Sequence, residues 1–262
     1  MNNSDSIKIV DKLVETFFVA GKLSLKIRSE ELIKKVKSDN TPVTNGDIEV
    51  NDILTKKISE LTPEIPIVSE ESSQNKENKN LENFWLIDPI DGTYDYIHGR
   101  DEFTLNAALI INKKPFIGII YAPAKDRMFY TYGQNASYEI NKGDKKEIKC
   151  EKASKVNEVK ALSYSDNLKS EILEIHKKYN VSNFTKMKSS LKFCVVASGE
   201  FDLYAAEPRA CEWDIAAGHA ILQNAGGIVT DFDGNEILYG KENFKNPSLI
   251  LKSKSLIKWM NN

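Results

Sequence analysis

The sequence predicts an α/β (α+β) protein built as two lobes that pack together as one unit. Two observations predict this class. Apolar residues at helical spacing fill most of the first 60 positions, whereas residues 84–138 form short apolar runs separated by turn residues. Strands and helices then alternate after about residue 150. With 262 residues, the chain is long enough for two small lobes, which we place at residues 1–145 and 146–262.

Helices are expected in the first 60 residues. A helix beginning near residue 5 has apolar side chains on one face, and Gly21 is expected to kink or interrupt it before a second amphipathic run around Leu32. Pro42 disfavours helical torsions at the residue before it, so this run ends there. A third apolar face begins at about Asp47 and predicts another helix.

Strands dominate the middle of the chain and return in the second lobe. The middle segments are typical of an antiparallel meander: "FWLIDPI", "TLNAALII", "PFIGIIYAP" and "RMFYTY". In the second lobe we expect, in order, a strand near 160–163, helices around 166–179 and 190–199, the strand "FDLYAA", a helix from Asp214 to Asn224 and the strand "IVTDF".

Composition excludes several classes of function. The net charge of −2 gives no basic footprint for a nucleic acid polymer. Three cysteines, far apart, match neither a disulfide framework nor a zinc site and suit a reducing cytosol. No run approaches 18 apolar residues, so we expect no transmembrane segment. A cytoplasmic protein is the prediction, with peripheral attachment at the inner membrane as an alternative.

The stretch "WLIDPIDGT" places two aspartates three positions apart at the end of an apolar strand. Pro89 favours a tight turn there, so Asp88 and Asp91 can converge while the Ile90 carbonyl faces the same way. Two carboxylates this close repel each other unless a cation neutralises them. Oxygen ligands of this kind suit a hard divalent ion, first of all Mg²⁺.

Two other element ends offer further carboxylates. Glu70 follows the short apolar strand "IPIVS", and Asp214 stands at the start of a predicted helix, where it can also act as a cap. Asp47 can likewise be a helix cap, because Thr44 and Asp47 fit a capping box. Together, carboxylates from three element ends are the arrangement that a two-metal phosphoryl-transfer site requires.

These motifs resemble the inositol monophosphatase superfamily, a group of Mg²⁺-dependent, lithium-sensitive phosphatases. The resemblance implies the layered αβαβα sugar-phosphatase fold of the inositol monophosphatase and fructose-1,6-bisphosphatase type. Within the superfamily, four segments resemble the CysQ branch, the 3'(2'),5'-bisphosphate nucleotidases, which remove the 3'-phosphate of adenosine 3',5'-bisphosphate, a by-product of sulfate activation. These segments are "DNTPVTNGD", "DEFTLNAALI", "GIIYAP" and "SSLKFCVVASGEFDLY".

The resemblance implies a role for each matching residue. Thr93 orients the attacking water and is held by Asp47, and Glu70 counts as both a catalytic residue and a metal ligand. The ligands implied for two or three Mg²⁺ ions are Glu70, Asp88, the Ile90 carbonyl, Asp91 and Asp214.

Substrate contacts follow from the same resemblance. Backbone N–H groups of Gly92 and Thr93 hold a phosphate oxygen, and Lys192 meets the remaining phosphate. Ser190 can instead be a simple helix cap, and Arg209 a surface ion pair. Glu207 lies where inositol-cleaving relatives hold a sugar hydroxyl. The full implied set is Ile90, Asp91, Gly92, Thr93, Ser190, Lys192, Glu207, Arg209 and Asp214.

We therefore expect a small phosphate ester as substrate, with adenosine 3',5'-bisphosphate first and an inositol or other sugar monophosphate as the alternative. A non-enzymatic metal- or nucleotide-binding module on the same scaffold is a third reading, and a homodimer is expected. One departure bears on specificity. Many bacterial relatives read Gly-Thr-Lys-Glu-Phe after the aspartates, whereas this chain has Tyr94, Asp95 and Tyr96 in the last three positions and so loses a local positive charge.

Overall fold

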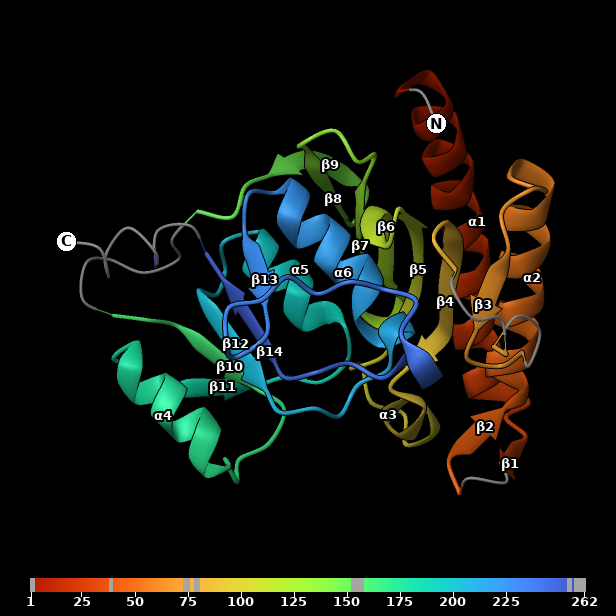
Figure 1. Ribbon diagram of the computed structural model, residues 1–262. Coiled ribbons are helices and arrows are strands. Elements are labelled where there is room, and N and C mark those ends of the chain that lie inside the picture. Colours follow the sequence, from red (N-terminus) through yellow and green to blue (C-terminus); the bar gives the residue numbers. More distant parts are fainter. Residues whose placement is uncertain are drawn as a thin grey trace.

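Five layers, alternately helical and β-sheet, build the protein (Figure 1). The computed structural model describes residues 3–37, 40–72, 76–77, 81–151, 158–253 and 256. The first layer is the helix pair α1 and α2, and the next is a seven-stranded sheet. Helices α5 and α6 separate this sheet from a five-stranded sheet, and α4 covers the far face. The predicted α/β class and αβαβα layering are confirmed. The helices of these layers are α1 (Asn3–Glu30), α2 (Asn45–Leu61), α4 (Ser170–Lys178), α5 (Leu191–Ala197) and α6 (Glu212–Asn224), and the short α3 (Thr93–Ile97) follows strand β4.

The seven-stranded sheet has the strand order β3-β4-β5-β6-β7-β8-β9. The pair β3–β4 is parallel and every other pair is antiparallel, so the predicted meander is confirmed. Alternate residues point to opposite faces, so Trp85 and Ile87 pack toward α1 and α2 while Leu86 packs toward α5 and α6. The strands are β3 (Ile67–Ser69), β4 (Phe84–Asp91), β5 (Thr104–Ile111), β6 (Lys114–Ala122), β7 (Arg127–Thr131), β8 (Ser137–Asn141) and β9 (Asp144–Ile148), with the 3-10 turn η1 (Pro123–Lys125) between β6 and β7.

Helix α1 is continuous through Gly21, so the predicted interruption is wrong. A Cβ at Gly21 would lie 2.3 Å from a Tyr121 ring carbon, so glycine lets the helix approach β6 closely. The second amphipathic helix is also wrong. Residues 34–36 form β1 (Lys34–Val36), which pairs with β2 (Pro42–Thr44). All three residues of β1 are exposed, and Val36 is 73% exposed, so the apolar side chains that suggested a helix face solvent in this hairpin.

The five-stranded sheet has the order β11-β10-β12-β14-β13 and mixes parallel and antiparallel pairs. The strands at 160–163, "FDLYAA" and "IVTDF" are confirmed, while β11 and β14 were not predicted. Both are short and pair only with strands distant in the sequence. The strands are β10 (Ala161–Ser163), β11 (Phe184–Lys186), β12 (Leu203–Ala206), β13 (Ile228–Thr230) and β14 (Leu249–Lys252), with the 3-10 turn η2 (Glu242–Phe244) before β14.

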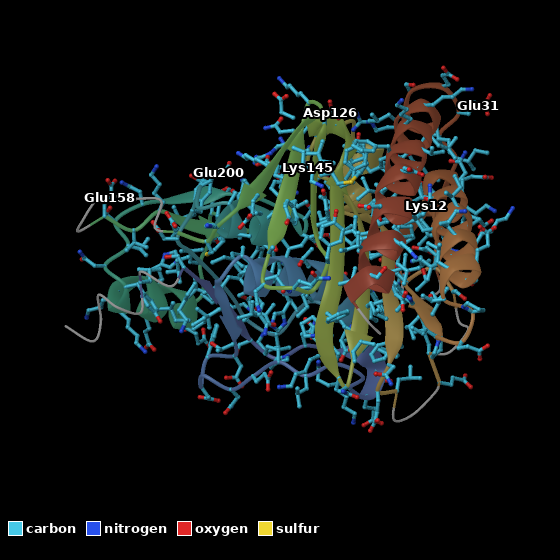
Figure 2. All side chains as sticks on the ribbon, turned by 90° about the horizontal axis from the view of Figure 1, so that it is seen from above. Lys12, Glu31, Asp126, Lys145, Glu158 and Glu200 are labelled. Atoms are coloured by element: carbon cyan, nitrogen blue, oxygen red, sulfur yellow. The ribbon has the colours of Figure 1, made fainter. Side chains whose placement is uncertain are left out.

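The charged side chains of Lys12, Glu31 and Glu158 lie on the outside of the layers (Figure 2). Among the described residues, no helix combines the length and the apolar character needed to cross a membrane. The division at residues 145 and 146 stays a prediction. The middle layer matters most for function, because the start of α6 and the loop before α5 meet the carboxyl end of β4.

Candidate active site

Strand β4 ends in a buried acidic turn. All its residues except Asp91 are buried, and Asp88 is only 1% exposed. The register between β4 and β5 shifts between Asp88 and Asp91, where Pro89 has no N–H to donate to the ladder. Thr93 Oγ1 donates to the carbonyl oxygen of Ile90 at 3.1 Å. The turn thus brings two carboxylates and one carbonyl to the same edge of the sheet.

Three carboxylates meet at this edge. Glu70, which follows β3, Asp88 and Asp214, in the first turn of α6, each offer an oxygen within 4.8 Å of the others. This convergence was predicted from the three element ends. Asp91 stands outside that trio, and its Oδ2 accepts bonds from Ser190.

The cluster is electrostatically strained without a cation. Burial, and then the charges of Glu70 and Asp91, raise the pKa of Asp88 well above its usual range. Burial also raises the pKa of Asp214 to about 8, with the charges of Asp91 and Glu70 next in size. Asp88 Oδ1 is buried and has no hydrogen-bond partner among the described residues. A divalent cation would satisfy this oxygen and neutralise its neighbours, so the residues fit a metal site.

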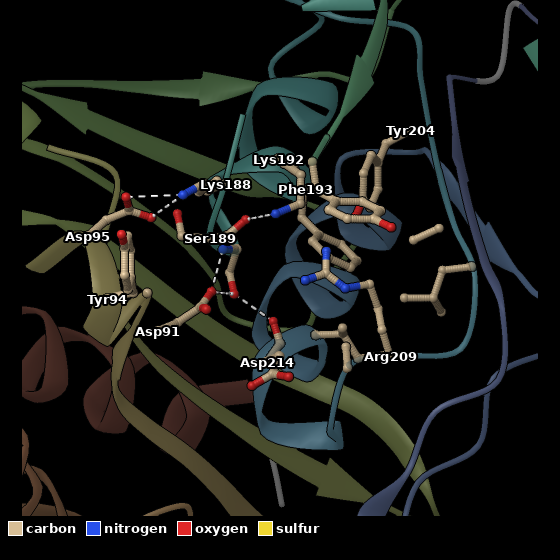
Figure 3. A pocket seen from close by; sticks show the side chains of 17 residues that line it. Asp91, Tyr94, Asp95, Lys188, Ser189, Lys192, Phe193, Tyr204, Arg209 and Asp214 are labelled. Atoms are coloured by element: carbon tan, nitrogen blue, oxygen red, sulfur yellow. Dashed lines mark hydrogen bonds and ion pairs between the residues drawn. The ribbon is translucent and has the colours of Figure 1, made fainter. Parts of the chain in front are cut away.

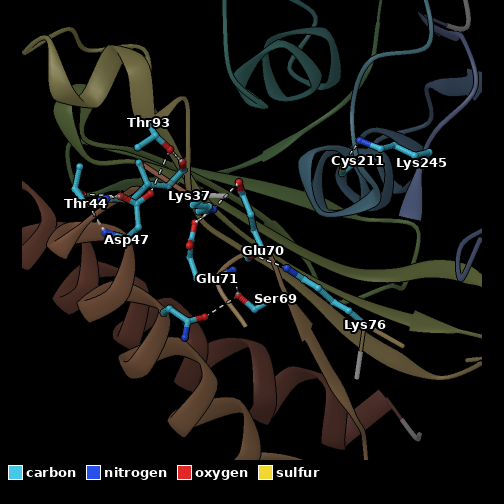
Figure 4. Close-up of polar contacts among 12 residues, drawn as sticks. Lys37, Thr44, Asp47, Ser69, Glu70, Glu71, Lys76, Thr93, Cys211 and Lys245 are labelled. Atoms are coloured by element: carbon cyan, nitrogen blue, oxygen red, sulfur yellow. Dashed lines mark hydrogen bonds and ion pairs between the residues drawn. The ribbon is translucent and has the colours of Figure 1, made fainter. Parts of the chain in front are cut away.

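A lysine that the sequence analysis did not single out faces the cluster. Lys37 Nζ lies 2.6 Å from Glu71 Oε1 and 3.3 Å from Glu70 Oε1 (Figure 4). Lys76 Nζ donates to the Glu70 carbonyl oxygen at 2.6 Å. Both lysines come from segments beside β1–β2 and β3, and only the folded chain shows that they face these acids.

Asp47 both caps α2 and holds Thr93. Its Oδ2 accepts from Thr44 N at 2.8 Å and from Thr44 Oγ1 at 2.6 Å. Its Oδ1 accepts from Thr93 Oγ1 at 3.2 Å (Figure 4). The two roles left open by the sequence are therefore compatible, one on each oxygen. Because Thr93 has one hydroxyl proton, which Asp47 and the Ile90 carbonyl share, its lone pairs remain able to accept from a water.

Gly92 makes the tight turn between β4 and α3 (Thr93–Ile97). Its φ is 93°, and a Cβ there would lie 2.8 Å from the Glu102 carbonyl oxygen, so only glycine fits. The first N–H groups of a helix have no acceptor inside it. The contact of the Gly92 and Thr93 N–H groups with a phosphate oxygen stays a prediction.

A cavity of about 330 Å³ opens beside the carboxylates. Asp91 and Tyr94 lie on one side of it, and Tyr204 and Arg209 on the other (Figure 3). Its other charged or aromatic lining residues are Asp95, Tyr164, Lys188, Lys192, Phe193 and Asp214.

Of three predicted substrate contacts, Lys192 and Arg209 line this cavity and Glu207 does not. The Lys192 ammonium donates to the Ser189 carbonyl, and burial lowers its pKa to about 8. The Arg209 guanidinium stacks 3.7 Å above the Tyr164 ring centre. Glu207 is not part of the lining: it accepts from the Tyr164 hydroxyl, so its substrate role stays a prediction.

Two further features of this cavity emerge only from the fold. Ser190 lines it, but its hydroxyl lies 2.6 Å from Asp91 Oδ2 and 2.5 Å from the Asp214 carbonyl oxygen. Its role as a substrate contact stays a prediction. Lys188 Nζ pairs with Asp95 at 3.0 Å, so this lysine brings positive charge to the position that Tyr94 leaves neutral. The sequence offered no signal for that contact beyond the lysines near "KSS".

Fold and site together define a phosphatase of the layered sugar-phosphatase class, with carboxylates at element ends arranged for divalent cations. More narrowly, the chain belongs to the inositol monophosphatase family, whose model matches residues 6–259. This family consists of metal-dependent phosphatases, so the protein is a phosphoric monoester hydrolase.

Three relatives illustrate the similarity. The 3'(2'),5'-bisphosphate nucleotidase CysQ of Buchnera aphidicola is 37% identical over 235 residues, which cover 88% of each chain. The crystal structure of CysQ from Bacteroides thetaiotaomicron has a TM-score of 0.74 at 27% identity, covering 96% of this chain and 98% of the other. An IMPase of Thermotoga maritima has a TM-score of 0.75 at 25% identity, covering 96% of each chain.

Proposed function

We propose that the protein is a Mg²⁺-dependent 3'(2'),5'-bisphosphate nucleotidase. It removes the 3'-phosphate of adenosine 3',5'-bisphosphate and releases AMP and phosphate, a reaction linked to sulfate assimilation. The observation that carries the proposal is a carboxylate cluster that opens into a cavity lined by both cations and aromatic rings. The CysQ relative, 37% identical over most of both chains, supports the same substrate.

The cavity suits a nucleotide with a second anionic group. Lys188, Lys192 and Arg209 line it and can meet a phosphate away from the reacting one. Tyr164 and Tyr204 also line it, and aromatic side chains are groups on which a base can stack. A sugar monophosphate has neither the base nor the second phosphate, so it would leave both features unused.

Five groups of this chain would hold the metal: the carboxylates of Glu70, Asp88, Asp91 and Asp214, and the Ile90 carbonyl. Mg²⁺, when bound, would supply Lewis acidity that neutralises phosphate charge and lowers the pKa of a bound water. We propose two or three ions in the site. The unpartnered Asp88 Oδ1 is the best evidence that this oxygen is built for a cation.

The chain's own residues would then position the reactants. Thr93 accepts a hydrogen bond from the attacking water, and Asp47 fixes the threonine hydroxyl. Glu70, whose charge acts on Asp47, would take part in the same proton movement. The N–H groups of Gly92 and Thr93 hold a phosphate oxygen, and Asp214 closes the other side of the site.

A phosphate-release assay tests the proposal. Adenosine 3',5'-bisphosphate and inositol 1-phosphate are compared at equal concentration, with Mg²⁺ and with a chelator. We expect metal-dependent release and a preference for the nucleotide. The matched control is Asp91→Asn, which should abolish turnover in a folded protein. Preference for inositol phosphate would favour a sugar monophosphatase instead, which the TM-score of 0.75 with the Thermotoga IMPase makes the second candidate. Absence of release from both substrates would favour the metal- or nucleotide-binding module over an active phosphatase.

Three further expectations stay proposals. A cytoplasmic location and a homodimer are testable by cell fractionation and by light scattering. The two-lobe division at residues 145 and 146 is testable by limited proteolysis.

A further inference from the structure

Asn106 lies directly across the sheet from a predicted metal ligand. In the antiparallel register of β4 and β5, Asn106 is the partner of Asp88, so the two side chains share one face. Both residues are 1% exposed. A buried amide among the mostly apolar residues of β5 needs a physical reason.

The amide of Asn106 reaches a hydroxyl that contacts two other parts of the site. Asn106 Nδ2 donates to Ser190 Oγ at 2.9 Å. Ser190 Oγ lies 2.6 Å from Asp91 Oδ2 and 2.5 Å from the Asp214 carbonyl oxygen, and Ser190 N donates to Asp91 Oδ2 at 2.5 Å. These bonds join β5, the loop before α5, the end of β4 and the start of α6.

Asn106 determines where the serine proton points. A hydroxyl has one proton and two lone pairs, and the amide donor occupies one lone pair of Ser190. The proton of Ser190 is therefore directed toward Asp91 or the Asp214 carbonyl, which are its two acceptors. When this proton points to Asp91, the hydroxyl and the N–H group of Ser190 both hold Asp91 Oδ2, which restricts the orientation of the other carboxylate oxygen.

Packing alone does not account for an asparagine at this position. Its Oδ1 is buried without a hydrogen-bond partner among the described residues, as is Asp88 Oδ1 on the same face. An unsatisfied buried acceptor costs about 1–3 kcal/mol, a cost that leucine would avoid. The amide therefore has a use that offsets this cost.

We propose that Asn106 is a positioning residue of the metal site, acting through Ser190 on Asp91. The inference rests on the metal site of the proposed function, but not on which phosphate ester is the substrate. Hydrogen bonds that orient a ligating carboxylate typically contribute about 10–100-fold to metal affinity. Asn106 should therefore affect Mg²⁺ binding far more than substrate binding.

The test measures binding of Mg²⁺ alone by isothermal titration calorimetry, without substrate. In Asn106→Leu, we expect the dissociation constant for Mg²⁺ to rise about 10–100-fold, while KM at saturating Mg²⁺ changes less than about threefold. Thr230→Val is the matched control. Thr230 lies in β13 of the five-stranded sheet, and its Oγ1 is likewise buried with no hydrogen-bond partner among the described residues, so its loss should leave Mg²⁺ affinity within about twofold.

A double-mutant cycle with Ser190→Ala tests the route. Because both residues act through one hydroxyl, the double variant should lose no more Mg²⁺ affinity than the weaker-binding single variant. Additive losses would overturn the route through Ser190. A folded Asn106→Leu protein with parental Mg²⁺ affinity would overturn the positioning role itself. If Asn106→Leu does not fold, unchanged Mg²⁺ affinity in Ser190→Ala contradicts the proposal equally well.

Discussion

Replacing Asp88 by asparagine should make the metal-free protein more stable and, at the same time, insensitive to Mg²⁺. Asp88 is buried among carboxylates, and its pKa is raised well above the usual range by burial and by Glu70 and Asp91. Asparagine has nearly the same shape and no charge. The substitution therefore removes a repulsion that the parent carries only because this site is built for cations.

The size of the effect follows from the geometry. The carboxylate oxygens lie within 4.8 Å of one another, and two unit charges at that separation repel by about 3 kcal/mol at an effective dielectric constant of about 20. Asp214, whose pKa is about 8, holds a proton for much of the time at neutral pH, which relieves part of this repulsion. We therefore expect Asp88→Asn to gain about 1–3 kcal/mol, or roughly 3–8 °C in Tm, in chelator at pH 7.5.

Thermal unfolding in chelator and in Mg²⁺ separates the two effects. Mg²⁺ at 100 times its dissociation constant should stabilise the parent by about 2.7 kcal/mol through mass action and should not stabilise Asp88→Asn. Glu15→Gln is the control, because Glu15 is an exposed partner of Lys12 and should change little. A metal-free Asp88→Asn protein less stable than the parent, or one still stabilised by Mg²⁺, would refute the reasoning.

Three other predictions follow from the same site. In chelator, the free energy of unfolding should fall as pH rises from about 4 to 8, because folded Asp214 keeps a proton that its unfolded form loses near pH 3.8; urea titrations at pH 5 and 8 check this. Thr93→Val should lower kcat about a hundredfold or more with little change in Mg²⁺ affinity, as steady-state kinetics and calorimetry would show. Lys188→Met should raise KM about tenfold for adenosine 3',5'-bisphosphate but not for 3'-AMP. Lys186→Met is the control and should change neither KM, because Lys186 pairs with Asp166 and does not line the cavity. An equal rise of KM for both substrates in Lys188→Met would contradict the role of Lys188.

The parts of the fold that the sequence predicted well are those with strong local signals. The start of α2 followed from Thr44 and Asp47, whose capping box is a contact within one turn. The meander followed from alternating apolar runs separated by turns. The failures have a physical cause as well. The apolar residues around Leu32 are spaced as in a helix, but the same spacing also fits an exposed hairpin. No local signal distinguishes the helix from the hairpin, because the hairpin depends on the pairing of β1 with β2.

The candidate site divides in a similar way. Asp88 and Asp91 were recognisable because like charges at the end of a buried strand are costly unless a cation is present. Lys37 and Asn106 were not recognisable, because a lysine in a polar loop and an amide in a strand are each common. Their contacts with Glu70 and Ser190 span 33 and 84 positions, so only the folded chain brings them together.

The sequence by itself determined the kind of chemistry: which carboxylates crowd together, which threonine follows them, and where the elements that carry them begin and end. These are properties of spacing and residue type over a few positions. The tertiary structure alone decided how the groups are held. In the folded chain, one oxygen of Asp47 accepts from Thr44 at the start of α2 and the other accepts from Thr93, and the Ser190 hydroxyl hydrogen-bonds to Asp91. The physical reason is that hydrogen bonds act only within about 3 Å, and segments far apart in the chain reach that distance only when the layers pack.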